Sequence, residues 1–241
     1  MKKSTKRKSY LQLLDDKCPN GHRLAIWAKR NGREKFIGCS EFPNCKYIES
    51  KTWLDFIRDD LGIPLTWRPK KSASIEEAMY RCQSRAEKQY LLGAVYYIHT
   101  NDFDYAPVKY KNIKHFGLTF SSVFGSLKMG GYTPTSLAIV PQVHFGIKSH
   151  HDFGIFYSGE KFPSENDWQL ELAVEIDYHP SHEWNPSVDE YRDSLVTYRV
   201  LRLNKGDDPL KWFRRVEGIY NTNAENELEN LDSSIANSKE I

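Results

Sequence analysis

The sequence has few cysteines and no long apolar run, and these absences exclude several classes of protein. Only 4 cysteines occur among 241 residues, and Cys18, Cys39 and Cys45 lie close together. A disulfide scaffold is therefore disfavoured, and a metal site in a reducing compartment is expected. No apolar run approaches the roughly 18 residues of a membrane span, and no apolar stretch of signal-peptide length follows the basic N-terminus. We expect a cytoplasmic protein without a membrane partner, nucleoid-associated if the host is bacterial.

Acidic residues are scarce at the front of the chain, which makes the charge asymmetric. Residues 1–71 carry 17 Lys and Arg against 8 Asp and Glu, a net charge of +9, whereas the remainder carries 17 against 24, a net charge of −7. A basic front end favours a polyanionic partner, although Lys2–Lys8 alone is equally consistent with a solubilising tail. Hydrophobic residues make up 39% and aromatic residues 13%, which is enough for a folded core.

Composition along the chain divides it into five segments. Residues 14–50 are rich in Cys, Pro, Gly and charge, as in a small domain held together by metal, and a larger domain follows a short helix and linker. The predicted segments are a basic arm at 1–13, a zinc ribbon at 14–50, a helix and linker at 51–74, a main domain at 75–220 with an inserted basic segment at about 100–137, and an acidic, disordered tail at 221–241.

Helices and strands alternate in the predicted main domain. The capping-box patterns Thr52–Asp55 and Ser84–Glu87 predict two helix starts. Period-two alternation is clearest at Leu170–Asp177, and the other predicted strands are Leu137–Val143, His151–Tyr157 and Tyr198–Leu203. Further helices are predicted at about 187–196 and 209–220. This order indicates an α/β fold with a mixed sheet flanked by helices.

The clustered cysteines have the spacing of a zinc site. Cys18 and His22 form one pair, Cys39 and Cys45 form another, and 16 residues separate the pairs. Zinc takes four tetrahedral sulfur or nitrogen ligands, which two short loops joined by a hairpin supply. Leu24–Gly38 is the predicted hairpin, with Asn31-Gly32 at its turn.

This segment resembles the zinc ribbon at the C-terminus of bacterial type I topoisomerases. The resemblance rests on Cys18-Pro19, on Phe36–Ser40 and on Phe42–Cys45. The family usually places its second cysteine where this chain has Gly21, and His22 is taken as the replacement ligand; a degenerate ribbon without metal is the alternative. Such ribbons bind nucleic acid, often single-stranded, which implies contacts here from basic residues near the hairpin tip and from stacking rings: Lys29, Arg30, Arg33, Lys35, Trp27 and Phe36.

The strongest chemical signal in the main domain is a set of carboxylates. Glu175 and Asp177 are two residues apart on a predicted strand and therefore share one face. Asp152 begins another predicted strand, and Glu87 lies early in a predicted helix. Acidic residues on a buried strand need a compensating cation, and a few carboxylates suffice to hold Mg²⁺. Solvent-exposed strand carboxylates, and a Glu87 that only caps its helix, are the alternatives.

These residues, in this order, resemble the PD-(D/E)XK nuclease superfamily, in particular the branch of very-short-patch repair endonucleases. The likeness covers roughly residues 84–205 and rests on Ser84–Glu87, Val140–Val143, Gly146, His151–Phe153, Ala173–His179, His182, Asp189, Tyr191–Asp193, Leu195 and Val200–Leu203. It implies a restriction-endonuclease-like fold and metal-dependent hydrolysis of a DNA phosphodiester. Asp152 and Glu175 would bind Mg²⁺ or Mn²⁺, and Glu87 would assist.

The chain departs from the family at two positions. Asp177 stands where the family usually has lysine, although this branch often has Asp there, and Tyr178 replaces a glycine. The work of the lysine must pass to another group. His179 is the first candidate for proton transfer or water orientation, with His182 and Gln142 behind it.

No Asp or Glu occurs from Tyr105 through His151. Lysines are interleaved there with Gly, Ser and Thr, a mixture that suits phosphate contacts, and the candidates are Lys109, Lys111, Lys114 and Lys128. A hydroxyl-rich β-extension without a substrate role is the alternative.

Three classes of function remain at this point. The leading one is a DNA endonuclease assisted by its zinc ribbon, with a helicase or another subunit of a larger nuclease system as a further partner. The second is a degenerate nuclease fold that binds DNA or a protein without cutting, which the absent lysine favours. The third is an RNA-binding or RNA-cleaving factor.

Overall fold

The computed structural model describes residues 10–28, 35–69, 72–101, 109–127, 135–145, 149–160, 162–177, 196–204 and 206–220. The chain divides into two compact units, Met1–Phe56 and Ile57–Ile241, and each unit is treated separately here. No helix among the described residues has both the length and the apolar character needed to cross a bilayer.

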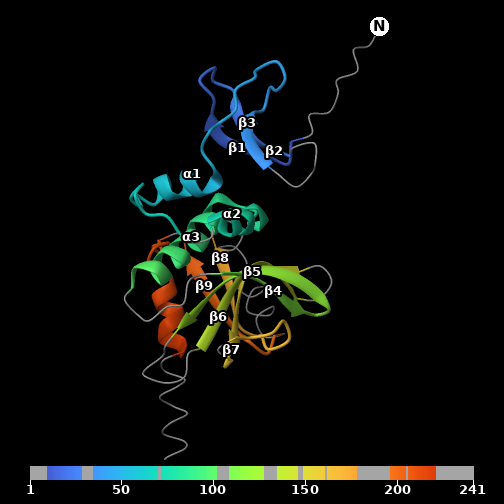
Figure 1. Ribbon diagram of the computed structural model, residues 1–241, viewed down its shortest axis with the longest axis vertical. Coiled ribbons are helices and arrows are strands. Elements are labelled where there is room, and N and C mark those ends of the chain that lie inside the picture. Colours follow the sequence, from blue (N-terminus) through green and yellow to red (C-terminus); the bar gives the residue numbers. More distant parts are fainter. Residues whose placement is uncertain are drawn as a thin grey trace, which may run out of the picture. The chain divides into compact units, whose positions relative to one another are not determined.

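The first unit is an antiparallel three-stranded ribbon in the order β1-β2-β3 (Figure 1). Its strands are β1 (Gln12–Lys17), β2 (Arg23–Ala28) and β3 (Lys35–Cys39). The β2–β3 register pairs Leu24 with Cys39 and Ala28 with Lys35, which is the expected hairpin, while its turn lies outside the described residues. Cys39 is the last residue of β3 and is paired with Leu24 near the start of β2. It therefore lies next to the turn that joins β1 to β2.

Helix α1 (Trp53–Asp60) follows the ribbon and begins and ends as its sequence predicts. The Thr52 amide donates to Asp55 Oδ2 at 3.1 Å, and the Asp55 amide donates to Thr52 Oγ1 at 3.3 Å, which closes the capping box. Gly62, at φ +64°, supplies the left-handed residue that ends the helix.

The second unit is an α/β domain with one mixed six-stranded sheet in the order β4-β5-β6-β7-β8-β9. All neighbouring strands are antiparallel except β8 and β9, which are parallel. The strands are β4 (Lys109–His115), β5 (Leu118–Leu127), β6 (Thr135–Phe145), β7 (Ser149–Ser158), β8 (Gln169–Asp177) and β9 (Arg199–Asn204). The mixed sheet confirms the coarse fold class expected from the sequence.

Two helices precede the sheet where the sequence predicted one helix of uncertain start. Helix α2 is Ser72–Arg81 and helix α3 is Arg85–Thr100, so α2 begins inside the segment that was expected to be linker. The Ser84 side chain caps α3 together with Glu87, and the break between the helices falls at this cap. Helix α2 packs against α3 and against β4, β5 and β6.

Helix α3 and the helical residues 213–220 cover the central strands. The Trp212 ring lies 6.3 Å from the Phe153 ring and 6.2 Å from the Tyr90 ring, and its indole N–H donates to the Tyr90 carbonyl at 2.9 Å. The middle of β8 is buried at four consecutive residues, Ala173 included, as expected for a strand that is covered on both faces. A charged group at the end of such a strand is consequently close to a low-dielectric core.

The basic segment at about 100–137 supplies β4 and β5, which extend the main sheet. Lys114 Nζ lies 3.3 Å from Glu165 Oε2, and Lys111 donates to the Pro163 carbonyl. Both described lysines therefore contact the loop before β8. The side chain of Lys109 and all of Lys128 lie outside the described residues, so the predicted phosphate contacts of this segment stay a prediction.

Candidate functional site

Three cysteines and one histidine meet in the first unit. Cys18 and His22 flank a tight turn in which Gly21 has a φ of +79°, a conformation that a side chain at this position would strain. The turn is closed by the Cys18 amide, which donates to the His22 carbonyl at 2.8 Å, and by the Gly21 amide, which donates to the Cys18 carbonyl at 2.8 Å. Glycine is the residue that takes this left-handed conformation without strain.

The ligand atoms have the spacing of a tetrahedral zinc site. The Sγ atoms of Cys18 and Cys39 are 3.8 Å apart, and His22 Nδ1 lies 3.5 Å from Cys39 Sγ and 3.8 Å from Cys18 Sγ. A tetrahedron with zinc–sulfur bonds of about 2.3 Å has edges of about 3.8 Å. All four ligand atoms, including Cys45 Sγ, lie within 4.8 Å of one another. The cluster can therefore bind a metal such as zinc, with His22 as the fourth ligand.

The polar surroundings of the thiols differ. Hydrogen bonds from the Tyr47 amide and from the Asn20 side chain, whose Nδ2 is 3.3 Å from the sulfur, lower the pKa of Cys45 to about 6. Burial raises the pKa of Cys39 to about 11, against the opposing hydrogen bond from the Glu41 amide. Because zinc binds thiolates, Cys45 is the ligand that is ready for metal near neutral pH, whereas Cys39 releases a proton as metal binds.

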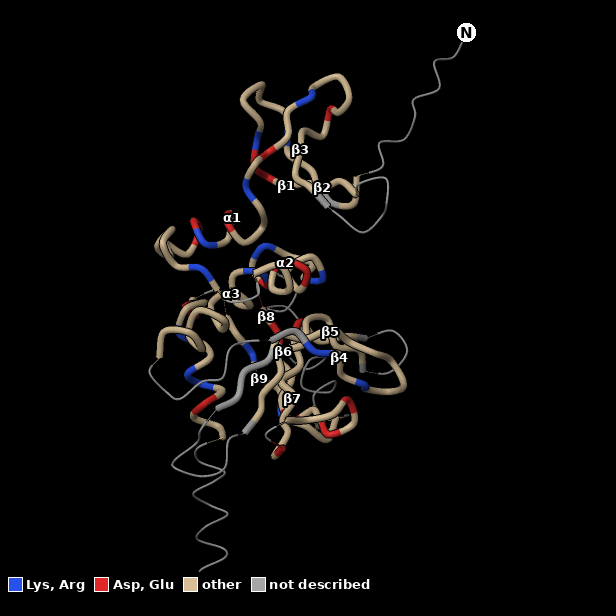
Figure 2. The backbone as a smooth tube through the Cα atoms, viewed as in Figure 1, with Lys and Arg blue, Asp and Glu red and all other residues tan. Residues whose placement is uncertain are grey.

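The ribbon is not basic over its described part. Residues 10–28 and 35–56 carry 5 Lys and Arg and 5 Asp and Glu, and Figure 2 shows the two signs interspersed along the tube. Lys29, Arg30 and Arg33 lie outside the described residues, so their contact with nucleic acid stays a prediction. Trp27 is only 9% exposed and packs between the rings of Tyr10 and Phe42 at 5.7 Å and 5.8 Å, which leaves little of its face for a base.

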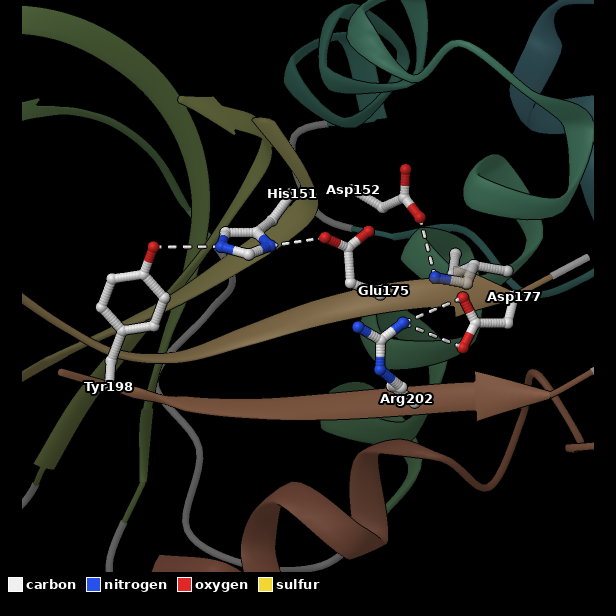
Figure 3. A network of polar contacts seen from close by, with 7 residues as sticks. His151, Asp152, Glu175, Asp177, Tyr198 and Arg202 are labelled. Carbon is white, nitrogen blue, oxygen red and sulfur yellow. Dashed lines mark hydrogen bonds and ion pairs between the residues drawn. The ribbon is translucent and has the colours of Figure 1, made fainter. Parts of the chain in front are cut away.

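In the second unit, Asp152 and Glu175 lie on paired strands. The β7–β8 pairing ends with Phe153 opposite Val174, and Asp152 and Glu175 are the next residues of the two strands. Asp152 Oδ2 accepts a hydrogen bond of 2.7 Å from the Ile176 amide, directly beside Glu175 (Figure 3). The two residues that the sequence nominated as principal ligands of a divalent ion are therefore neighbours at one end of the sheet.

The electrostatics of Asp152 reflect several carboxylates in one partly buried place. Burial first, and then the charges of Glu87, Glu175 and Asp177, raise its pKa from 3.8 to about 7 against the opposing hydrogen bond from the Ile176 amide. These surroundings disfavour the charged form of the carboxyl, so it releases its proton at a higher pH than an exposed aspartate does. Perturbed acids of this kind are typical of functional sites, although structural networks produce them too.

Glu175 is held by a histidine that the sequence did not nominate for this contact. His151 Nδ1 lies 2.6 Å from Glu175 Oε1, and His151 Nε2 lies 3.0 Å from the Tyr198 hydroxyl. His151 is 2% exposed and Glu175 is 9% exposed. In a regular strand, the adjacent residues His151 and Asp152 would point to opposite faces of the sheet. The pairing of β7 with β8 ends at Phe153, before both of them. The sequence pattern does not reveal this end of the pairing.

Asp177, at the position of the family lysine, faces an arginine. Arg202 Nη1 lies 3.3 Å from both carboxylate oxygens of Asp177, and the parallel β8–β9 register pairs Arg202 with Glu175. Arg202 thus brings a permanent positive charge to the acidic end of the sheet (Figure 3). Sequence reasoning missed it, because the alternation of Val200–Leu203 indicates a strand but not which neighbour that strand has.

Glu87 and Gln142 are joined in an amide–carboxylate network beside these residues. Gln142 Nε2 donates to Glu87 Oε2 at 2.7 Å, and Gln83 Nε2 donates to Gln142 Oε1 at 2.7 Å. Glu87 also accepts from the amides of Gln83 and Ser84 at 2.9 Å and 2.8 Å, so it caps α3 as well. Gln142 has a φ of +56° within β6, a strained backbone that is often found at functional sites.

The structure brings together five of the residues nominated from the sequence of the main domain: Glu87, Gln142, Asp152, Glu175 and Asp177. Within the described ranges, the Cys18–Cys45 cluster is the only group of three or more His, Cys, Asp or Glu residues whose ligand atoms all approach within 4.8 Å. The described residues of the second unit contain no such group of carboxylates. His179 and His182 lie outside the described residues.

Comparisons of the chain with family models, with curated proteins and with solved structures found no match. The resemblance to PD-(D/E)XK nucleases and to topoisomerase zinc ribbons consequently rests on the residues quoted above.

Proposed function

We propose that this chain is a metal-dependent DNA endonuclease whose zinc ribbon helps to hold the substrate. The observation that carries the proposal is the position of Asp152, whose carboxylate reaches the Ile176 amide beside Glu175 while its pKa is raised to about 7. Two oxygen ligands at the ends of neighbouring strands, next to further carboxylates, match the way in which proteins hold Mg²⁺ with a few carboxylates, water and substrate phosphate.

The residues divide the work of phosphodiester hydrolysis among them. Asp152 and Glu175 would bind Mg²⁺ or Mn²⁺, which, when bound, polarises a phosphoryl oxygen and lowers the pKa of an attacking water. The water oxygen forms a bond to phosphorus while the bond to the leaving sugar oxygen breaks. Arg202, which pairs with Asp177 at 3.3 Å, keeps a positive charge near the developing negative charge, the task that the family gives to its lysine.

Gln142 and Glu87 are hydrogen-bonded to each other and support this arrangement. The Gln142 amide joins Glu87 to Gln83, so its side chain is fixed although its backbone is strained. A fixed amide beside Glu87 can orient a water or a phosphate oxygen by hydrogen bonding. His179 keeps its predicted role in proton transfer, as the residue that follows β8 by two positions.

Plasmid cleavage tests the proposal. The parental protein should nick supercoiled DNA with Mg²⁺ and not with a chelator, and Asp152→Asn should lose at least about a hundredfold in rate, since even outer-shell partners of metal sites cost 10- to 100-fold. The matched control is Asp59→Asn, which removes an exposed carboxylate from α1. A parental rate in Asp152→Asn, with DNA binding intact, would show that the site assignment is wrong.

A module that binds DNA without cutting it is the second candidate. It is favoured by the partners that the acidic groups already have, since Glu175 contacts His151 at 2.6 Å and Asp177 contacts Arg202 at 3.3 Å. This candidate predicts retention of DNA in a gel-shift assay and no Mg²⁺-dependent nicking by the parental protein. A parallel assay with matched RNA and DNA oligomers decides between the two nucleic acids.

A further inference from the structure

His151 bridges two strands at the acidic end of the sheet and belongs to none of the roles described so far. It lies on β7, its Nδ1 is 2.6 Å from Glu175 Oε1 on β8, and its Nε2 is 3.0 Å from the hydroxyl of Tyr198, immediately before β9. Its ring meets the Tyr198 ring edge-on at a centroid distance of 5.6 Å. Figure 3 shows the three side chains in a row, with the Glu175 carboxylate between His151 and Asp152.

The chemistry of the row fixes the direction of one hydrogen bond. A carboxylate only accepts, so the short contact with Glu175 requires a proton of the imidazole on Nδ1. The Tyr198 hydroxyl, which can donate or accept, hydrogen-bonds Nε2 on the other side of the ring. Tyr198 therefore holds the ring in the orientation that points Nδ1 at Glu175, as outer-shell groups do around metal ligands.

Burial restricts what His151 can do. It is 2% exposed, and both of its nitrogens face protein groups. A general acid or base must come within hydrogen-bond reach of the proton that it moves. The geometry suits a group that acts on Glu175 and not one that meets a substrate.

We propose that His151 is a positioning residue that sets the rotation of the Glu175 carboxylate for a divalent ion, and that Tyr198 sets His151 in turn. This inference rests on the proposed metal-dependent function. Partners of this kind are worth 10- to 100-fold in metal affinity in other metal sites. His151 should therefore act on the binding of metal more than on the rate at saturating metal.

The test is calorimetric titration of Mn²⁺ into the zinc-loaded full chain, with the Mg²⁺ dependence of plasmid cleavage measured in parallel. His151→Ala should weaken Mn²⁺ binding by about 10- to 100-fold and leave the cleavage rate at saturating metal within about threefold. His151→Asn places an amide nitrogen where Nδ1 stands and should recover most of the affinity. Tyr198→Phe should lose a smaller part of it.

The control is His144→Ala, which removes an exposed imidazole from β6 and should bind Mn²⁺ as the parental protein does. Unchanged Mn²⁺ affinity in folded His151→Ala, or a loss of rate at saturating metal with unchanged affinity, would overturn the inference. If His151→Ala does not fold, the inference is overturned when the Mn²⁺ affinities of His151→Asn and Tyr198→Phe do not follow the predicted order. A parental protein that binds Mn²⁺ but cuts nothing refutes the nuclease and still reports on His151, whereas one that binds no Mn²⁺ refutes both.

Discussion

The surroundings of Asp152 raise the pKa of its carboxyl strongly. Its pKa is raised from 3.8 to about 7, by burial first and then by Glu87, against the hydrogen bond from Ile176. Between these two values the folded chain keeps a proton that the unfolded chain has released. The free energy of unfolding therefore falls as pH rises through this window, the reverse of the behaviour of a salt-bridged carboxylate.

Replacing Asp152 by Asn should remove this dependence. The amide keeps an oxygen for the Ile176 N–H but carries no charge, so in the absence of divalent metal the variant should be more stable than the parental protein by about 1–3 kcal/mol at about pH 8 and nearly equal to it at about pH 4. Urea denaturation at the two pH values measures this. Parallel pH profiles for the two proteins would contradict the assigned pKa.

At the residue scale, the sequence predicted types and positions better than contacts. Cys18, His22, Cys39 and Cys45 could be found because zinc spacing is local, and His22 meets the three thiols as expected. Glu175 was nominated from strand alternation and Asp152 from the resemblance to the nuclease superfamily, and Asp152 contacts the amide next to Glu175. The contacts of His151, Tyr198 and Arg202 depend on register and on strand order, which no local pattern encodes.

At the scale of elements, periodicity predicted the buried strands and capping boxes predicted the helix starts. The β8 prediction Leu170–Asp177 differs from Gln169–Asp177 by one residue, and Ser84 caps α3 as predicted. No strand was predicted within the basic segment at about 100–137, because its many Gly, Ser and Thr residues weaken both periodicities, yet β4 and β5 lie there. Helix α2 was missed in part because it contacts the sheet through few apolar residues: Ile75, Ala78 and Met79.

Helix α3 approaches the backbone at Pro209 closely because Gly93 has no side chain. A Cβ on Gly93 would lie 1.7 Å from the Pro209 carbonyl oxygen and 2.6 Å from its carbon, both backbone atoms. Gly93→Ala should therefore force the two segments apart and cost about 3 kcal/mol or more. Gly218→Ala, where a Cβ meets nothing within 4 Å, is the matched control and should be neutral or slightly stabilising. Thermal unfolding of both variants checks this, and equal destabilisation would refute the packing argument.

At the scale of the whole molecule, two compact units have separate sources of stability. The first unit is a small ribbon whose buried thiols surround a metal site, and the second has its own apolar core around Phe153 and Trp212. We expect a ribbon of this size to depend on a bound metal, since small domains bury too little apolar surface to fold without such a link. The composition of the sequence indicated a small segment held together by metal at 14–50 and a larger domain after it.

Removal of zinc should consequently unfold one unit only. The chain should hold one zinc per molecule, Cys39→Ser should lose it, and Cys82→Ser, which changes a buried cysteine outside the cluster, should keep it. In hydrogen exchange of the full chain, a strong chelator should abolish the protection of β2 and β3 and leave that of β6, β7 and β8 unchanged. Loss of protection in both units together would show that the zinc site supports the whole chain.

The central claim is that Asp152 and Glu175 share one divalent ion. Electron paramagnetic resonance of Mn²⁺ added to the zinc-loaded chain measures this directly, without dependence on substrate or turnover. The account predicts one bound Mn²⁺ in the parental protein and in Asp59→Asn, and a loss of at least about tenfold in affinity in Asp152→Asn and in Glu175→Gln alike. Full Mn²⁺ binding in either of the two site variants would contradict it.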